Sequence, residues 1–370
     1  MKASESNPNY PSKVREMTNY TIREIKKVCK DIGPRPSGEE NERKAQDYVA
    51  DSMSKVADSV VKEKFELHPK AFMGWVPLDV ILMTISVILT LLSYFDVLPS
   101  ASTAFSVVSV VLTSLAIIFT FFEFLLYKKF LDPFFPKRET YNVVCTRKAA
   151  GETKRRIVFS GHIDSAYEWY FTHLGGGKLL TTMIALAFGA IAITLAASIV
   201  SFFDVPNGVR VTAIVVLFVC LIPILMCSMF VNWKLCVPGA NDNLTGVFAS
   251  MSVLRYMAAN DIRFENTEVV CVSMACEEAG LRGAKEYVKK HCGEDDVETV
   301  FVGTDTLRDF DDMGVYNKDM TGTVKLDKQA AAMVKHASDI AGYNLPYSSV
   351  FFGSRSEERR VGKECRSRWS

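Results

Sequence analysis

The sequence lacks the hallmarks of several common protein classes. Its nine cysteines are scattered and contain no CxxC pair, so neither a dense disulfide framework nor a zinc finger is expected. No apolar segment follows the first charged residues, which argues against a cleavable signal peptide. Lys and Arg total 43 against 42 Asp and Glu, so charge does not favour a nucleic-acid partner. We therefore expect mostly reduced cysteines and no nucleic-acid binding.

Apolar residues, by contrast, are abundant and make up 49% of the chain. Stretches with the roughly 20 residues that a helix needs to cross the hydrocarbon layer are 75–98, 104–127, 179–203 and 209–233. Short turns within each pair predict two transmembrane hairpins, 75–127 and 179–233, and hence contact with a lipid bilayer. Buried helices of a large soluble core are the alternative, but these runs are long and nearly free of charge, which favours the membrane.

Charges near the ends of these stretches predict the orientation, because cytoplasmic flanks are enriched in Lys and Arg. The two turns contribute only Arg210. The outer flanks carry Lys62, Lys64, Lys70, Lys128, Lys129, Lys137, Arg138, Lys178 and Lys234. We therefore expect an integral membrane protein whose polar part faces the cytoplasm.

The polar remainder, residues 1–70, 136–178 and 236–354, predicts one discontinuous α/β domain. Three short apolar runs, RIVFSGHID, EVVCVSMACEE and TVFVGTD, end in polar residues and alternate with helical segments. This order is typical of a mixed, largely parallel central sheet with helices on both faces. Ligands bind beyond the carboxyl ends of such strands, so the polar residues that end each run are where a site is expected.

The last stretch, residues 355–370, reads RSEERRVGKECRSRWS and departs from this pattern. It resembles the translation of a sequencing-library adapter more closely than a solvated basic tail. We hypothesise that it is non-native and that the natural protein continues differently after about Ser354. A genome that encodes this tail would contradict the hypothesis.

Two motifs combine turn or strand-end positions with metal-binding side chains. In GHID, His162 can offer its imidazole to a metal ion while Asp164 orients the ring. In PGANDNLTG, Asp242 lies among turn formers immediately before a helix. Each has a structural alternative, because a strand-end histidine is often structural and Asp242 can cap the helix.

Two further strand ends add carboxylates. Glu277 and Glu278 directly follow a strand, where adjacent buried carboxylates repel each other unless a cation or a proton neutralises one. Asp305 ends the run TVFVGTD. With His162 these residues form a mixed nitrogen and oxygen set that suits zinc, with manganese or cobalt as alternatives. One glutamate of the pair can bind metal while its neighbour acts as general base.

The ordered motifs GHIDS, PGANDNLTGV, ACEEAGLRGAKEYV and the strand before Asp305, preceded by IGPRPSGEENERKAQDYV, resemble those of the family-28 zinc metallopeptidases. This family contains co-catalytic di-zinc aminopeptidases, and the resemblance spans roughly residues 20–70 and 140–354. It implies a zinc exopeptidase-like fold, two zinc ions and a peptide substrate. By the resemblance Asp242 bridges the two metals, His162 and Asp305 complete one site, and Glu278 belongs to the other.

The resemblance also implies a mechanism. Glu277 is the general base and Asp164 supports His162. A water held between the metals loses its proton to Glu277 and attacks a peptide carbonyl polarised by zinc, and the glutamate then protonates the leaving amine. A membrane-anchored exopeptidase, most simply an aminopeptidase, is the function implied.

Two features depart from the family pattern. Asp242 follows Asp164 by 242 − 164 = 78 positions, and the intervening segment includes the second predicted hairpin. The family's last ligand, a histidine near the C-terminus after a segment resembling FFGS at 351–354, is absent because the adapter-like tail replaces it. No other histidine (His68, His173, His291 or His336) matches a ligand motif. We expect an incomplete second metal site and an inactive truncated chain.

Two other functions are consistent with these residues. A glutaminyl-cyclase-like acyl transferase would share the fold but use one zinc, and a membrane scaffold would need no catalysis. The GANDN motif and the paired glutamates favour hydrolysis over both. The sequence leaves open amino- against carboxypeptidase specificity, side-chain preference and oligomeric state.

Overall fold

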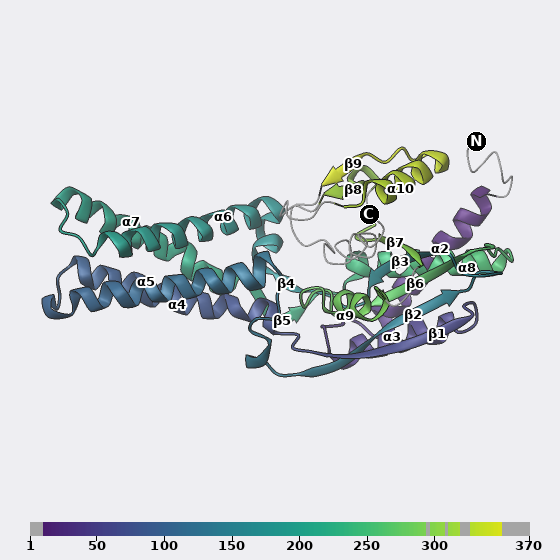
Figure 1. Ribbon diagram of the computed structural model, residues 1–370, viewed down its shortest axis with the longest axis horizontal. Helices are drawn as coiled ribbons and strands as arrows, with labels where there is room; N and C mark the ends of the chain where they lie inside the picture. Colours follow the sequence, from purple (N-terminus) through teal and green to yellow (C-terminus); the bar gives the residue numbers. More distant parts are fainter. Residues whose placement is uncertain (1–9, 294–296, 308–309, 319–325, 350–370) are drawn as a thin grey trace. The chain divides into compact units, whose positions relative to one another are not determined.

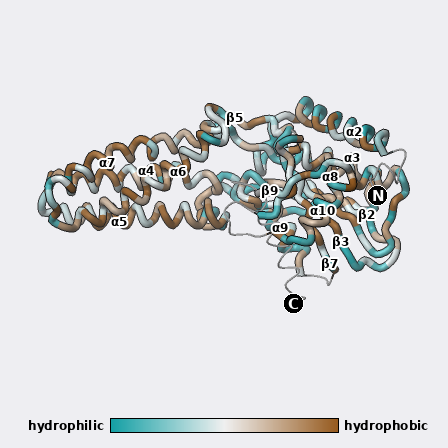
Figure 2. The backbone as a smooth tube through the Cα atoms, turned by 90° about the horizontal axis from the view of Figure 1, so that it is seen from above, coloured by the Kyte–Doolittle hydropathy of each residue, from teal (hydrophilic) through white to brown (hydrophobic). Residues whose placement is uncertain are grey.

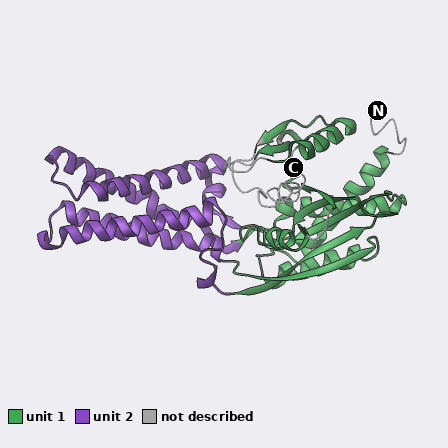
Figure 3. Ribbon diagram, in the orientation of Figure 1, with its two compact units in different colours: residues 1–69, 137–166, 236–370 green, residues 70–136, 167–235 purple. Residues whose placement is uncertain are grey.

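The computed structural model describes residues 10–293, 297–307, 310–318 and 326–349 (Figure 1). The chain forms two compact units (Figure 3). Unit 1 comprises residues 1–69, 137–166 and 236–370, and unit 2 comprises residues 70–136 and 167–235. The chain therefore leaves unit 1 and returns to it twice. The segment FFGS and the tail 355–370 lie outside the described residues, so the predictions made for them stay predictions.

A five-stranded sheet organises unit 1 in the order β1, β2, β6, β3, β7. The strands are β1 (Ser59–Leu67), β2 (Arg138–Arg147), β6 (Thr267–Met274), β3 (Arg155–His162) and β7 (Glu298–Gly303). Pairing is antiparallel between β1 and β2 and between β2 and β6, and parallel on both sides of β3. The predicted mixed sheet is confirmed. Its parallel part, β6, β3 and β7, brings three carboxyl ends to one edge.

Helices cover both faces of this sheet, as predicted. The helices α2 (Tyr10–Asp31), α3 (Glu40–Met53) and α8 (Thr245–Ala259) pack on one face with inward residues such as Val143 and Cys271. Helix α9 (Arg282–His291) packs through Tyr287 on the other face, against Val144 and Val272. Successive strand residues point to opposite faces, so these continuously apolar strands are buried on both sides.

A smaller group of elements follows β7 in unit 1. Strands β8 (Val315–Lys318) and β9 (Tyr347–Ser349) pair in parallel, and α10 (Lys328–Ala341) lies between them in the chain. Asp327 caps α10 by accepting hydrogen bonds from the backbone N–H groups of Gln329 and Ala330. Gly342 ends the helix in the left-handed conformation that glycine adopts without strain.

Unit 2 is built from four long helices, which are the apolar part of the chain in Figure 2. They are α4 (Ala71–Tyr94), α5 (Ser102–Phe119), α6 (Tyr170–Val200) and α7 (Asn207–Met226), with short strands β4 (Tyr167–Trp169) and β5 (Val231–Cys236). A π-helical turn, η2 (Thr120–Leu125), extends α5. Within the described residues four helices are long and apolar enough to cross a membrane, which confirms the four predicted apolar helices.

The interior of unit 2 is held partly by small hydroxyl side chains. Ser86 of α4 lies 2.6 Å from the hydroxyl groups of Ser109 and Thr113 of α5, and Thr90 lies 2.8 Å from Ser198 of α6. Small polar residues let helices approach closely and hydrogen-bond across their interface in a lipid environment. Large apolar residues such as Ile81 and Val215 face outward, as expected for a bundle solvated by lipid.

Candidate metal centre

The predicted site residues meet at the carboxyl edge of the parallel strands in unit 1. His162 ends β3, Glu277 and Glu278 follow β6, and Asp305 follows β7. Asp242 comes from the loop before α8. Ligand atoms of His162, Asp242 and Asp305 all lie within 4.8 Å of one another, and so do those of His162, Glu277 and Glu278. The structure thus brings the four candidate carboxylates around the imidazole of His162.

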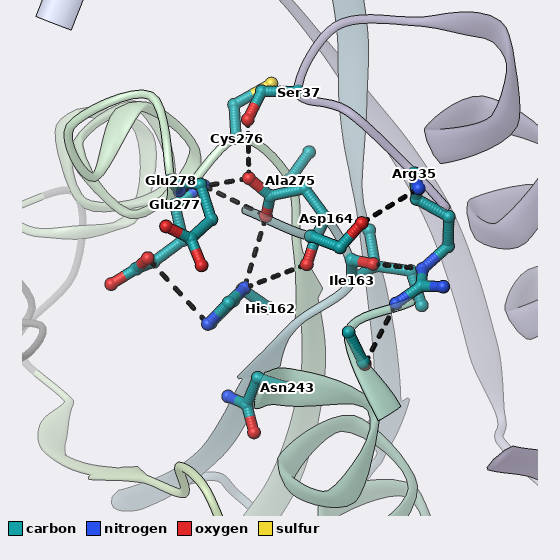
Figure 4. Close-up of polar contacts among 12 residues, drawn as sticks. Arg35, Ser37, His162, Ile163, Asp164, Asn243, Ala275, Cys276, Glu277 and Glu278 are labelled. Carbon is teal, nitrogen blue, oxygen red and sulfur yellow. Dashed lines mark hydrogen bonds and ion pairs between the residues drawn. The ribbon is translucent and has the colours of Figure 1, made fainter. Parts of the chain in front are cut away.

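The His162 ring is buried, with 1% of the side chain exposed, and its two nitrogens face different carboxylates (Figure 4). Its Nδ1 lies 3.3 Å from Asp164 Oδ1. Its Nε2 lies 3.0 Å from Asp242 Oδ1 and 3.7 Å from Glu277 Oε2. Burial alone would lower the pKa of His162, but Glu277, Asp164 and Asp242 raise it overall. A hydrogen bond from Nδ1 to Asp164 would leave the Nε2 lone pair free for a metal ion.

Asp164 does more than orient the imidazole. Its fully buried carboxylate accepts hydrogen bonds from the backbone N–H of Glu277 at 3.1 Å and of Glu278 at 3.0 Å. Ser37 donates its hydroxyl to the same carboxylate at 2.7 Å. Burial raises the pKa of Asp164, but His162 and these donors lower it overall, so the group stays ionised. One carboxylate therefore positions both the histidine and the glutamate pair.

Arg35 joins three loops beneath the site. Its side chain is fully buried and donates to the backbone carbonyls of Ile163, Gly33, Pro238 and Gly239 over distances of 2.6 to 3.0 Å. The N-terminal loop, the GHID loop and the PGAND loop are thereby tied to one guanidinium. Local sequence patterns predict no role for Arg35. The only sequence feature that points to it is its place in the motif IGPRPSGEE.

The loop that carries Asp242 depends on two small or compact residues. Gly239 has φ of +58°, and a Cβ there would lie 2.5 Å from Ser165 Cβ and 2.7 Å from Arg35 Nη2. Asn243, fully buried, donates to the Thr304 carbonyl at 3.0 Å and accepts from the Gly246 N–H at 2.9 Å. Because Thr304 precedes Asp305, Asn243 links the two loops that present Asp242 and Asp305.

A second buried acid lies behind the glutamate pair. Glu42 of α3 accepts hydrogen bonds from the Cys276 N–H at 2.8 Å, the Gly38 N–H at 3.0 Å and the Thr140 hydroxyl at 2.6 Å. Burial, followed by the charge of Asp164, raises the pKa of Glu42 to about 7. Sequence reasoning missed Glu42, Ser37 and Asn243, because each acts through contacts with residues far away in the chain.

The donors at this edge fit zinc. One imidazole nitrogen and several carboxylate oxygens form the set that zinc accepts in hydrolytic sites. Burial, followed by repulsion from Asp242 and Glu277, holds the pKa of Glu278 well above its usual range. Such crowded carboxylates need a neutralising cation or proton, and a dication would relieve their repulsion.

Comparison with known proteins finds a family model that matches part of the chain. Residues 227–354 match the model of peptidase family M28. This stretch contains Asp242, Glu277, Glu278 and Asp305 but not His162 or Asp164. The resemblance to the family-28 metallopeptidases is therefore confirmed. No curated protein matches the chain.

Solved structures align with this chain over most of its length. An aminopeptidase from Aneurinibacillus sp. strain AM-1 aligns with a TM-score of 0.50 and 12% identity, over 94% of this chain and 82% of that chain. BSAP, a zinc aminopeptidase from Bacillus subtilis, aligns with a TM-score of 0.49 and 12% identity, over 94% and 82%. A glutaminyl cyclase from Bacteroides thetaiotaomicron aligns with a TM-score of 0.49 and 11% identity, over 94% and 80%. The first of these supports the exopeptidase-like fold.

Proposed function

We propose that the natural protein from which this chain derives, whose residues 227–354 match the model of peptidase family M28, is an integral membrane zinc exopeptidase that removes amino-terminal residues from short peptides. One observation carries the proposal. His162 Nε2 lies 3.0 Å from Asp242 and 3.7 Å from Glu277, while Asp164 holds the other ring nitrogen. This is an imidazole prepared to bind a metal ion beside a carboxylate that can accept a proton.

The proposed zinc ligands are His162, Asp242, Glu278 and Asp305. His162 and Asp305 would serve one ion and Glu278 a second, with Asp242 shared between them. The close grouping of His162, Asp242 and Asp305 supports the first of these two sites. Zinc bound there would polarise the peptide carbonyl and make water a better nucleophile at neutral pH.

Glu277 is the proposed general base. Its side chain is 10% exposed, which lets it reach a substrate while restricting bulk water. Asp164 accepts a hydrogen bond from the Glu277 backbone N–H, and this contact restricts where the Glu277 carboxylate can lie. It would accept the proton of the attacking water and deliver it to the departing amine. Asp164 acts through His162 and the glutamate backbone and does not contact the substrate.

The decisive experiment compares the two glutamates in the full-length protein, reconstituted in lipid nanodiscs and loaded with zinc. Glu277→Gln is expected to keep its zinc but to lower kcat on aminoacyl substrates by about 10²- to 10⁴-fold. Glu278→Gln is expected to lower the zinc content itself, measured by atomic emission. Asp261→Asn changes a fully exposed carboxylate and is the matched control.

Two results would overturn the proposal. A zinc-loaded protein that cyclises amino-terminal glutamine but cleaves no aminoacyl or dipeptide substrate would be an acyl transferase. A folded protein that binds no zinc and hydrolyses nothing would be a scaffold. Carboxypeptidase activity on the same panel would retain the hydrolase but replace the aminopeptidase specificity.

We further propose that unit 2 spans the bilayer and that unit 1 faces the cytoplasm. The length and hydropathy of α4 to α7 support the first statement. The concentration of Lys and Arg outside the hairpins supports the second. Alkaline phosphatase, which is active only outside the bacterial cytoplasm, should be active when inserted in the turn before Asn207 and inactive when fused before Tyr10. The reverse pattern would refute the orientation.

A further inference from the structure

A short segment of unit 2, residues 126–136, directly follows the second apolar helix. The helical span formed by α5 and η2 ends at Leu125, and the segment leads from there towards β2. It reads LYKKFLDPFFP and thus combines two lysines with three phenylalanines. None of the proposed zinc ligands belongs to it.

Packing within unit 2 fixes the shape of this segment. Leu131 is 4% exposed, and its backbone N–H donates to Glu123 Oε1 at 2.6 Å. A single 3₁₀ turn, η3 (Asp132–Phe134), follows. The Phe135 ring then packs on α4, where it leaves no room for a Cβ on Gly74. The exposure of the other side chains is therefore built into a defined turn.

Two phenylalanines of the segment point outward. Phe134 is 79% exposed and Phe130 is 46% exposed. The centroid of the Phe130 ring lies 5.3 Å from that of Phe122 and 6.1 Å from that of Phe119. Because Phe119 and Phe122 belong to the end of the apolar span, Phe130 lies beside the last turns of that span. In a membrane this is the boundary between hydrocarbon and headgroups, where aromatic rings concentrate.

The charges exposed at this end of the helices are basic. Exposed lysines flank the apolar runs of all four helices here, at Lys70, Lys128, Lys129, Lys178 and Lys234. The carboxylates of unit 2 at the same end are covered, since Glu123 is fully buried, Asp132 is 7% exposed and the Glu168 side chain is 15% exposed. The two exposed carboxylates of unit 2, Asp96 and Asp204, lie in the turns at the opposite ends of the hairpins. The surface beside Phe130 and Phe134 therefore favours an anionic partner.

We propose that residues 126–136 bind an anionic phospholipid, with Lys128 and Lys129 on its phosphate and Phe130 and Phe134 among the upper parts of its acyl chains. A lysine ammonium carries a positive charge and donates hydrogen bonds, so it suits a phosphate. A zwitterionic phospholipid brings its own cation, which offsets this attraction. Free phosphate would satisfy the lysines but leave Phe134 in water. The proposal rests on the membrane placement proposed for unit 2 and not on the zinc site.

An indole introduced by Phe134→Trp reports this contact in the full-length protein, reconstituted in phosphatidylcholine vesicles. Its emission is the difference between the variant and the unmodified protein. Phosphatidylglycerol brominated near the top of its acyl chains is expected to quench this emission at about fivefold lower mole fraction than equally brominated phosphatidylcholine, since one lysine near the membrane surface contributes about this factor. Lys128→Gln together with Lys129→Gln should remove the difference, and high salt should reduce it.

Two double substitutions distinguish the effect of charge from an effect on folding. Lys128→Arg with Lys129→Arg keeps both charges and should retain the preference. Lys26→Gln with Lys30→Gln changes two exposed lysines of α2 in unit 1 and should have no effect. Equal quenching by the two lipids, or quenching by neither, would overturn the proposal. A preference that inorganic phosphate abolishes at constant ionic strength would overturn it in favour of a soluble-anion site. Alkaline phosphatase fusions test the membrane spans separately, so a failed lipid site and a failed span are distinguishable.

Discussion

Asp164 accepts a hydrogen bond from the backbone N–H of Glu277 at 3.1 Å, across a separation of 113 residues. The same carboxylate faces His162 Nδ1 at 3.3 Å. A single side chain thus sets the position of the proposed base and the orientation of the proposed ligand. We expect its removal to disturb both metal binding and proton transfer.

Asp164→Asn tests this relationship. The amide introduced at position 164 would place an N–H group against backbone and imidazole donors that now meet a carboxylate. His162 and the glutamate pair would then be held less well, so zinc affinity should fall about 10- to 100-fold. Zinc titration of the full-length protein measures the change. Asp51→Asn, on the exposed face of α3, is the matched control and should bind zinc like the unmodified protein. Unchanged zinc affinity in Asp164→Asn would contradict the positioning role.

Arg35→Lys tests whether one guanidinium holds three loops together. An ammonium group cannot reproduce the fork that reaches Ile163, Pro238 and Gly239 at once. We expect a loss of about 3 kcal/mol in the free energy of unfolding, because a buried network is broken. Thermal denaturation in detergent measures it. Arg43→Lys, at a partly exposed site on α3, should cost much less; equal losses would show that Arg35 has no special role.

Alanine variants of two glycines with positive φ distinguish the effect of a steric clash from the effect of backbone strain. Gly239→Ala would put a methyl group 2.5 Å from Ser165 Cβ, so we expect the Asp242 loop to shift and hydrolysis to be lost. Gly342→Ala, with φ of +88° and nothing within 4 Å, should cost only about 1 kcal/mol of backbone strain and leave hydrolysis unchanged. Aminopeptidase assays of both purified variants decide the matter. Full activity in Gly239→Ala would refute the close contact.

The raised pKa of Glu42 predicts that the free energy of unfolding depends on pH. Its pKa is raised from 4.5 to about 7 in the folded protein, so the folded state holds a proton that the unfolded state has released. The contribution of protonated Glu42 to the free energy of unfolding is fully present below about pH 4.5 and is lost as the pH rises through about 7. The loss amounts to at most about 3.5 kcal/mol, because one pKa unit corresponds to about 1.4 kcal/mol.

Chemical denaturation of the zinc-free protein between pH 5 and pH 8 measures this contribution as a difference between variants. Glu42→Gln cannot ionise, so its stability should decline less over this range than that of the unmodified protein. Glu40→Gln changes the exposed neighbour near the start of α3 and should follow the unmodified protein. Parallel curves for Glu42→Gln and the unmodified protein would rule out Glu42 as the titrating group.

Much of the architecture could be predicted from the sequence. The four apolar runs predicted helices long enough to cross a membrane, because span length is set by the thickness of the hydrocarbon layer. The runs that carry His162, Glu278 and Asp305 predicted strands of a mixed, largely parallel sheet with helices on both faces, and the fold confirms this. The order of the strands in the sheet was not predicted. The roles of individual site residues, the number of zinc ions and the cytoplasmic orientation stay predictions.

The sequence by itself determined which segments are long and apolar enough to cross a membrane and which strand ends carry donor groups, because hydrophobic length and strand periodicity are local properties of the chain. Only the tertiary structure decided how those donors are held. Arg35 reaches Gly239 across 204 residues and Glu42 reaches Cys276 across 234, and contacts of this range leave no local pattern to read.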